Sequence, residues 1–182
     1  MSYNTITIFD WDDTLYPTTY IMHNHINVNY FTELDSNLRK LLEKILSYGK
    51  VIIITNATVP WVKYCLKQLP RTNELINARI QIISARQLLT SMSNWKTNTF
   101  IKVINQITST NIKNNIISIG DADYEYNALV NLNAQLKKPN ILKSIKLKSA
   151  PSPQLIIKQL KLITYHINDI INKDRHLELN MI

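Results

Sequence analysis

Glycine is scarce in this chain. The 182 residues include two, Gly49 and Gly120, where average usage of about 7% would supply roughly a dozen. The dinucleotide-binding loop G-x-G-x-x-G and the phosphate-binding loop G-x-x-x-x-G-K-[ST] each need at least two glycines in one short window. Because the two glycines stand far apart, the sequence excludes these commonest nucleotide-binding classes.

The shortage has a compositional explanation. Isoleucine and asparagine, whose codons are rich in A and T, account for 28 and 21 residues. Glycine, alanine and proline have GC-rich codons, so an AT-rich genome would deplete them together. The composition therefore predicts a source such as a protist, an endosymbiont or a large DNA virus.

Cysteine and long apolar segments are also rare. Cys65 stands alone, which excludes an internal disulfide and a cysteine zinc cluster. No apolar run approaches the ~18 residues needed to cross a bilayer, and residues 1–9 lack the basic and apolar regions of a signal peptide. We therefore expect a soluble protein of the cytoplasm (the host cytoplasm if the source is a virus) with no membrane partner.

Acidic residues are few, and nearly half of them are clustered. The chain has 21 basic and 13 acidic residues and a net charge of +8. Six of the acids fall in two short windows: Asp10, Asp12 and Asp13, then Asp121, Asp123 and Glu125. Clustered carboxylates repel one another unless a cation binds them, so a metal site is the first hypothesis. The basic excess fits nucleic acid as a partner, but a charge excess spread along a chain is more typical of a solvated surface.

Short apolar runs alternate with helical patterns along the chain. Five Ile/Val-rich runs predict buried parallel strands: Thr5–Phe9, Val51–Ile54, Ile80–Ile83, Ile116–Ile119 and Ile141–Leu147. Helices are expected from about residue 34 to 46, after Thr58, and near 97–108, 124–132 and 153–171. The alternation predicts an α/β fold, a doubly wound, Rossmann-like, mainly parallel five-stranded sheet with helices on both faces. Residues 1–182 are expected to form a single domain.

Individual residues suggest where some elements begin and end. Gly49 follows the helical pattern of residues 34–46, where a helix C-terminus favours a left-handed residue. Thr58 precedes Val59-Pro60, which is typical of an N-cap with proline in the first turn. Gly49 and Gly120 both flank predicted site strands, where a left-handed turn or a close backbone approach favours glycine.

Polar residues follow three predicted strands directly. Phe9 is followed by Asp10, Ile54 by Thr55-Asn56, and Gly120 by Asp121. Ligands of a doubly wound sheet bind beyond the carboxyl ends of its strands. Two carboxylate clusters and a hydroxyl are therefore expected at one edge of the sheet.

The chain resembles the haloacid dehalogenase-like (HAD) superfamily of phosphohydrolases in four segments: Asp10-Trp11-Asp12-Asp13-Thr14, Thr55-Asn56, Lys96 and Gly120-Asp121. The resemblance covers roughly residues 5–130, and the segments occur in the order of the family's motifs. Those motifs are D-x-D-x-T, a Ser or Thr after an apolar strand, a Lys, and an acidic pair after another strand. The position of Asp13 is more often glycine in the family.

The resemblance implies a Mg²⁺-dependent phosphatase that forms an aspartyl-phosphate. Asp10 would be the nucleophile and Asp12 the general acid and base. Asp10, Asp121 and the backbone carbonyl of Asp12 would bind Mg²⁺, which prefers hard oxygen ligands. The cation is needed because a phosphomonoester repels an anionic nucleophile. Thr55 and Lys96 would hydrogen-bond the phosphoryl oxygens.

Several assignments stay open. Asp13 either belongs to the site or only faces solvent or caps the loop. Lys102 competes with Lys96, but an active-site lysine belongs at a helix start, which favours Lys96. The second acid of the fourth motif is Glu125 or Asp123, with Glu125 preferred as a neighbour of the metal, although an acid at either position also suits a helix N-terminus.

The remaining residues near the motifs have plainer alternatives. Asn56 is expected just behind the phosphate-binding residues, and Thr14 is expected to order the loop. Thr55 could be an ordinary strand-end residue. Trp11 and Trp61 are predicted to be packing residues, with an aromatic edge beside the pocket as the alternative.

The spacing leaves little room for a cap domain of the kind that HAD enzymes use on small metabolites. About 19 residues separate Thr14 from the helix predicted near Leu34, enough for a loop and a hairpin. The 40 residues between Thr55 and Lys96 are largely taken up by a helix and a strand. A capless site suits a phosphoprotein, a nucleic-acid end, or a small phosphate enclosed by an oligomer partner.

Two other classes fit part of the pattern. A receiver-like signalling module also combines strand-end acids with Thr and Lys, but its phospho-accepting Asp follows the third strand, and here residues 80–83 run into Ser84-Ala85. A catalytically silent binding protein on the same fold would bind metal without turnover, and the intact acids argue against it. The phosphatase is the leading hypothesis.

Overall fold

The computed structural model describes residues 3–24, 28–87, 95–108, 112–135 and 140–181. The strands are β1 (Asn4–Phe9), β2 (Gly49–Thr55), β3 (Gln81–Ser84), β4 (Asn114–Gly120), β5 (Asn140–Leu147) and β6 (Leu177–Met181). The helices are α1 (Thr18–His23), α2 (Val28–Leu46), α3 (Val59–Leu66), α4 (Pro70–Arg79), α5 (Trp95–Ile107), α6 (Asp123–Gln135) and α7 (Pro153–Asn172), with a 3₁₀ turn at Ala85–Gln87.

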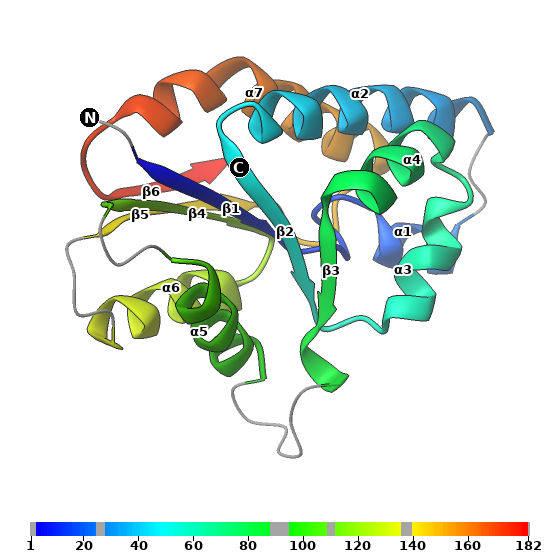
Figure 1. The fold of residues 1–182 in the computed structure, drawn as a ribbon. Coiled ribbons are helices and arrows are strands. Elements are labelled where there is room, and N and C mark those ends of the chain that lie inside the picture. The colour runs from blue at the N-terminus through cyan, green and yellow to red at the C-terminus, as the bar shows by residue number, and fades with distance from the viewer. Residues whose placement is uncertain (1–2, 25–27, 88–94, 109–111, 136–139, 182) are drawn as a thin grey trace.

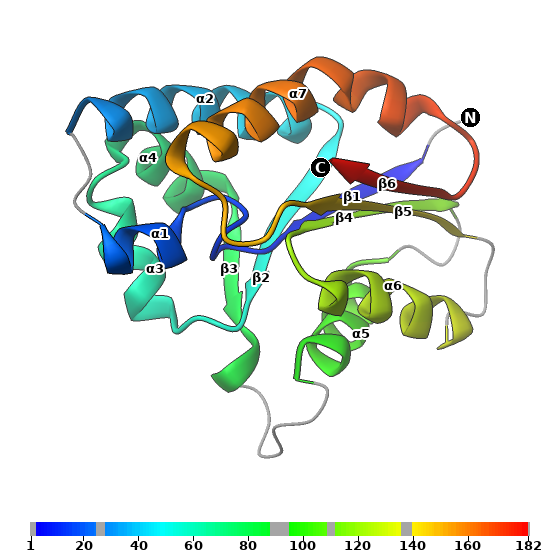
Figure 2. The ribbon, with the colours of Figure 1, turned by 180° about the vertical axis from the view of Figure 1, so that it is seen from behind.

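One sheet organises the chain, and helices cover both of its faces (Figures 1 and 2). Apolar residues of α2, α3, α4 and α7 form the core on one face, and those of α5 and α6 form the core on the other. Every strand pair is parallel. The doubly wound α/β prediction is therefore confirmed.

The strand order is β3-β2-β1-β4-β5-β6. This is the order of the Rossmann fold, and it differs from the flavodoxin-like order 2-1-3-4-5. The chain builds outward from β1 in one direction, then crosses over to β4 and builds in the other. Ligands of such sheets bind at the carboxyl ends of the strands beside this switch point, which here lies between β1 and β4.

The sheet has six strands rather than the predicted five. The additional strand, β6, pairs with β5 in parallel register after the crossover through α7. Its sequence Leu-Glu-Leu-Asn-Met alternates apolar and polar residues, which is the pattern of a half-buried strand. The prediction missed this segment because it contains no Ile or Val and follows a run of charged residues.

More of the chain between the motifs is helical than the sequence predicted. α2 begins at Val28 instead of near Leu34, and helix α1 occupies part of the segment predicted as a loop and hairpin. Two helices, α3 and α4, precede β3 where one was expected. None of the helices in the described part of the chain has the length and apolar character needed to span a bilayer.

The two boundary predictions had different outcomes. Thr58 is the N-cap of α3, and its Oγ1 accepts a hydrogen bond from the Trp61 amide at 3.3 Å, as predicted. Gly49 is not a left-handed C-cap, because α2 ends at Leu46 and neither glycine has a positive φ. A Cβ on Gly49 would lie 2.1 Å from the Thr5 carbonyl oxygen, so close approach of β1 and β2 requires glycine there. This contact is at the amino end of the sheet, away from the predicted site.

Candidate active site

A buried ion pair lies at the carboxyl end of β1. Lys96 Nζ is 2.9 Å from Asp10 Oδ1, and the two side chains are 5% and 10% exposed. The amide of Asp10 donates to the Ile119 carbonyl at 3.0 Å, which ties this residue to β4 at the switch point. Burial of a single charge is costly, so each of these groups needs the other as a partner.

Helix α5 carries Lys96 to this position. Its apolar side packs Phe100, Val103 and Ile104 into the core beneath the sheet. This packing places the first turn of the helix, where Lys96 lies, toward the strand ends. Lys102 lies farther along the same helix and is exposed, so of the two lysines only Lys96 is placed to reach Asp10.

The loop after Asp10 turns tightly around one carbonyl group. The Trp11 carbonyl accepts the amides of Thr14, Leu15 and Tyr16 at 3.3, 2.9 and 3.1 Å. Trp11 and Thr14 are both fully buried, and Trp11 packs in the core as predicted. The Thr14 hydroxyl has no hydrogen-bond partner in the described part of the chain, so its loop-ordering role stays a prediction. The Trp11 ring stacks on Tyr16 with centroids 5.9 Å apart.

Asp13 provides the sharp turn of this loop. Its φ is 55°, in the left-handed region that glycine and, among other residues, Asp and Asn adopt most readily. Its carboxylate is buried and accepts hydrogen bonds from the amide of Thr19 at 2.9 Å and from the Thr19 hydroxyl at 2.5 Å. Asp13 therefore holds the loop against the start of α1, and its side chain does not face solvent.

Helices α1 and α3 lie side by side near this edge of the sheet (Figures 1 and 2), and Asp12 is hydrogen-bonded to a residue of each. Two donors converge on one of its oxygens. Thr18 Oγ1 donates to Asp12 Oδ1 at 2.5 Å, and Trp61 Nε1 donates to the same oxygen at 3.0 Å. No described residue donates a hydrogen bond to Asp12 Oδ2, so this oxygen can bind a substrate or exchange a proton with it.

Thr55 ends β2 next to β1 and is completely buried. Its Oγ1 accepts a hydrogen bond from the Ala57 amide at 3.0 Å, so its hydroxyl hydrogen can be donated elsewhere. Beside it, Asn56 Oδ1 is buried and has no hydrogen-bond partner among the described residues. The Thr55 hydroxyl could therefore donate to a bound oxyanion, whereas Asn56 Oδ1 needs a donor such as a water molecule.

Ser84 is a site neighbour that sequence reasoning did not select. It ends β3 in register with Thr55, and its buried Oγ likewise has no hydrogen-bond partner in the described part of the chain. The same strand-end rule that selected Thr55 also applies to Ser84, because it directly follows the apolar run Ile80–Ile83.

The acids of the fourth motif lie in different surroundings. Asp121 directly follows β4 and is half-buried, and its carbonyl accepts from Ser149 Oγ at 2.6 Å. Asp123 is exposed and forms an ion pair with Lys146 of β5. Glu125 belongs to α6, but its side chain is outside the described part of the structure. The ion pair with Lys146 thus holds Asp123 at β5.

The donors at this edge fit Mg²⁺ through oxygen atoms of different kinds. Asp10 and Asp121 follow neighbouring strands, and the backbone carbonyl of Asp12 belongs to the intervening loop. Within the described ranges, no three His, Cys, Asp or Glu side chains gather closely enough to hold a metal by themselves. Two carboxylates and a carbonyl would leave further positions to water, which Mg²⁺ commonly retains.

Cys65 lies behind the loop and is excluded as a nucleophile. Its thiol is free and buried, and burial, with a smaller contribution from the nearby Asp12 carboxylate, raises its pKa to about 12. Burial also raises the pKa of Tyr16 well above its ordinary value. Both groups are therefore neutral at pH 7 and serve as packing for the loop.

Comparison of the chain with protein-family models, with curated protein sequences and with solved structures found no match.

Proposed function

We propose that this chain is a Mg²⁺-dependent phosphomonoester hydrolase that acts through an aspartyl-phosphate. The observation that carries the proposal is the buried ion pair between Asp10 and Lys96, at the switch point where ligands of this sheet type bind. Ion pairing favours the ionised form of a carboxylate, which is the form that attacks phosphorus. The resemblance of four segments to HAD motifs supports the same chemistry.

In the first step, a carboxylate oxygen of Asp10 attacks phosphorus, and the bond from phosphorus to the leaving oxygen breaks. The leaving oxygen takes a proton from the acid form of Asp12. In the second step, Asp12 removes a proton from water as the water oxygen attacks phosphorus. The bond between phosphorus and the Asp10 oxygen then breaks, inorganic phosphate leaves, and both aspartates return to their starting state.

Other groups would bind the phosphoryl oxygens during these steps. Lys96 supplies a buried positive charge, and Thr55 supplies a hydroxyl hydrogen that its contact with Ala57 leaves available. Mg²⁺, when bound by Asp10, Asp121 and the Asp12 carbonyl, would neutralise the phosphoryl charge that otherwise repels the attacking carboxylate.

A macromolecular substrate is supported by what surrounds the site. In the described ranges, the segment after the first motif contains one short helix, α1, and α3 and α4 contribute their apolar residues to the core. Within residues 15–24, 28–33 and 56–87, neither segment forms a separate domain over the strand ends. We therefore favour a phosphoprotein or a phosphorylated nucleic-acid end, because an open site admits a phosphate attached to a large surface.

The test of the activity is hydrolysis of p-nitrophenyl phosphate by the purified chain. Release of p-nitrophenol should require Mg²⁺, stop in EDTA, and fall by at least ~10³-fold in Asp10→Asn, since this change removes the nucleophile. Asp169→Asn, on the exposed side of α7, is the matched control and should retain full activity.

Turnover that survives in Asp10→Asn would exclude Asp10 as the nucleophile. Metal binding without turnover on any phosphorylated substrate would instead favour the silent binding protein. The substrate class is tested by comparing phosphopeptides, 3′- and 5′-phosphorylated oligonucleotides and small sugar phosphates. Hydrolysis of a sugar phosphate alone would contradict a macromolecular substrate.

A further inference from the structure

Trp61 reaches the site from α3, an element outside the four motif segments. Thr58 and Pro60 set the start of this helix, so Trp61 lies in its first turn. Its ring packs against the core on one side and stacks on Tyr64, with centroids 5.9 Å apart and 21° between planes. These contacts fix the direction of the indole N–H, which points at Asp12 Oδ1 from 3.0 Å.

The second donor to this oxygen comes from a different element. Thr18 is the first residue of α1, is 8% exposed, and donates its hydroxyl hydrogen to Asp12 Oδ1 at 2.5 Å. An oxygen that accepts two hydrogen bonds has both lone pairs engaged. Oδ2 is thus the oxygen of Asp12 to which no described residue donates.

We propose that Trp61 is a positioning residue that, together with Thr18, holds the Asp12 carboxyl group by its Oδ1 and so leaves Oδ2 as the oxygen that acts on the leaving group. This inference rests on the proposed phosphatase function. The Trp61 N–H and the Thr18 O–H both donate to Oδ1 and fix the carboxyl plane. Proton transfer between Oδ2 and the leaving oxygen then needs no rotation of the Asp12 side chain. Trp61 does not itself touch the reacting atoms.

The proposal makes the role of Trp61 dependent on the leaving group. Departure of p-nitrophenolate needs little protonation, whereas departure of an alkoxide depends on a general acid. The value of kcat/KM reports the steps up to leaving-group departure. Trp61→Phe retains an aromatic ring but lacks the N–H, so kcat/KM for β-glycerophosphate should fall about 10- to 100-fold, and that for p-nitrophenyl phosphate less than about 3-fold.

Tyr64→Phe is the matched control, since it changes the exposed stacking partner of Trp61 on the same helix and leaves the contacts of Asp12 intact. The ratio of the two kcat/KM values should be unchanged. Thr18→Val removes the other donor and should shift the ratio in the same direction as Trp61→Phe. Thr18→Ser retains a hydroxyl and should restore the wild-type ratio.

The outcomes separate this inference from the proposed function. Equal losses on both substrates in Trp61→Phe and Thr18→Val, or no loss on either, would overturn the positioning role even if Asp10→Asn abolishes activity. Wild-type inactivity toward both substrates, or activity that survives in Asp10→Asn, would overturn the proposed function and this inference with it. Far-ultraviolet circular dichroism of each variant verifies that the chain is folded.

Discussion

Two lysines of α5 show how burial separates residues of one type. Lys96 is 5% exposed and pairs with Asp10, whereas Lys102 points to solvent. The carboxylate of Asp10 would be left buried without this partner if Lys96 were replaced. The position of the lysine along the helix was predictable, but the contact was not, because it depends on how α5 packs beneath the sheet.

Lys96→Met should lower kcat/KM for p-nitrophenyl phosphate by about 10² to 10³-fold, because a donor to the phosphoryl oxygens is lost. In metal-free buffer at pH 7 it should also lower the free energy of unfolding by about 3 kcal/mol, since the buried Asp10 carboxylate loses this ion pair. Urea unfolding and steady-state kinetics measure the two effects. Lys102→Met is the control and should change the stability by less than about 0.5 kcal/mol; equal effects of the two substitutions would contradict the assignment.

Asp13 illustrates a local requirement that several residue types can meet. The chain needs a left-handed backbone at this position, and Asp supplies it while its carboxylate binds Thr19. The sequence placed Asp13 in the loop but left its role open. The contact with Thr19 decides between those alternatives, since it shows an acid that orders the loop.

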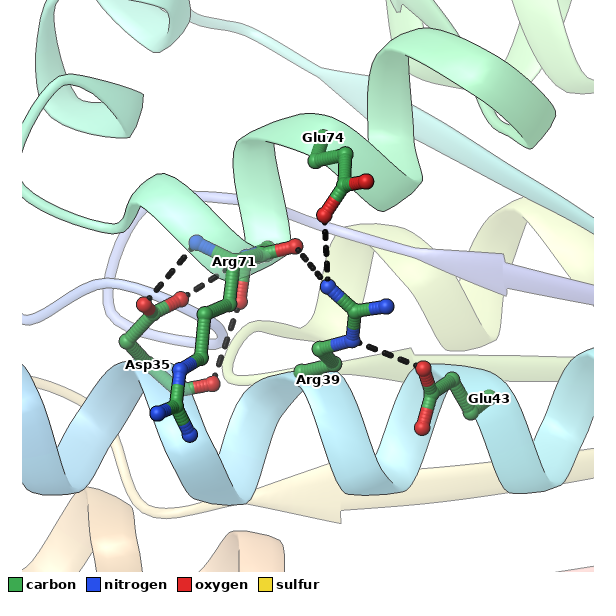
Figure 3. Close-up of polar contacts among 6 residues, drawn as sticks. Asp35, Arg39, Glu43, Arg71 and Glu74 are labelled. Carbon is green, nitrogen blue, oxygen red and sulfur yellow. Dashed lines mark hydrogen bonds and ion pairs between the residues drawn. The ribbon is translucent and has the colours of Figure 1, made fainter.

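Among the elements, α4 depends on a residue from another helix. Its N-cap, Leu69, makes no side-chain hydrogen bond to the first turn. Asp35 of α2 takes this place, and its carboxylate accepts the amides of Arg71 at 3.0 Å and Thr72 at 2.8 Å (Figure 3). The start of α4 contains no Ser, Thr, Asp or Asn at the cap position, so this helix could not be placed from local capping rules.

Asp35→Ala should lower the free energy of unfolding by about 2 kcal/mol, because two amides of the first turn, one of them buried, lose their acceptor. Glu74→Ala is a control in the same cluster. Glu74 is exposed and bonds Arg39 at 2.9 Å (Figure 3), and exposed ion pairs contribute about 0–1 kcal/mol. Urea unfolding of the two variants compares the contributions, and a loss in Asp35→Ala no larger than in Glu74→Ala would contradict the capping role.

At the scale of the whole molecule, Lys143 joins the sheet to α7. It is fully buried on β5, and its Nζ donates to the Ile171 carbonyl at 2.8 Å. Asn115 of β4 donates to the same carbonyl at 3.0 Å. The end of α7 is thus held by two strands, with the negative end of the helix dipole next to the ammonium group. Burial lowers the pKa of Lys143 from 10.5 to about 8, and Asp174 partly opposes this shift.

The lowered pKa of Lys143 predicts a pH dependence with a definite sign. Between about pH 8 and pH 10.5 the unfolded chain binds more protons at this group than the folded chain, so the stability contributed by Lys143 rises with pH. The difference in unfolding free energy between wild type and Lys143→Met should therefore shift in favour of wild type, by at most about 3 kcal/mol across this range. Urea unfolding at several pH values measures it. Lys158→Met, exposed on α7, should show a constant difference from wild type; a constant difference in Lys143→Met as well would exclude the shifted pKa.

The α/β class, strands β1 to β5 and the strand ends at which Asp10, Thr55 and Asp121 stand were all predictable from the sequence. These properties follow from periodicity and from the polar residue that directly follows each apolar run, so each depends on the sequence of a single element. The packing of Trp11 and the capping role of Thr58 belong to the same group. The pattern of β6 was equally local, but the strand contains no Ile or Val, the residues by which the other five strands were predicted.

Three features depend on tertiary packing: the strand order, the ion pair of Asp10 with Lys96, and the two donors on Asp12. Trp61 and Asp12 are 49 positions apart, and Asp35 is 37 positions from the Thr72 amide that it caps. Contacts over such separations depend on which elements pack together and at what register, and no local pattern carries that information. The residue types of the candidate site could therefore be predicted from the sequence. Which oxygen of Asp12 receives no hydrogen bond depends instead on how α1 and α3 pack around it.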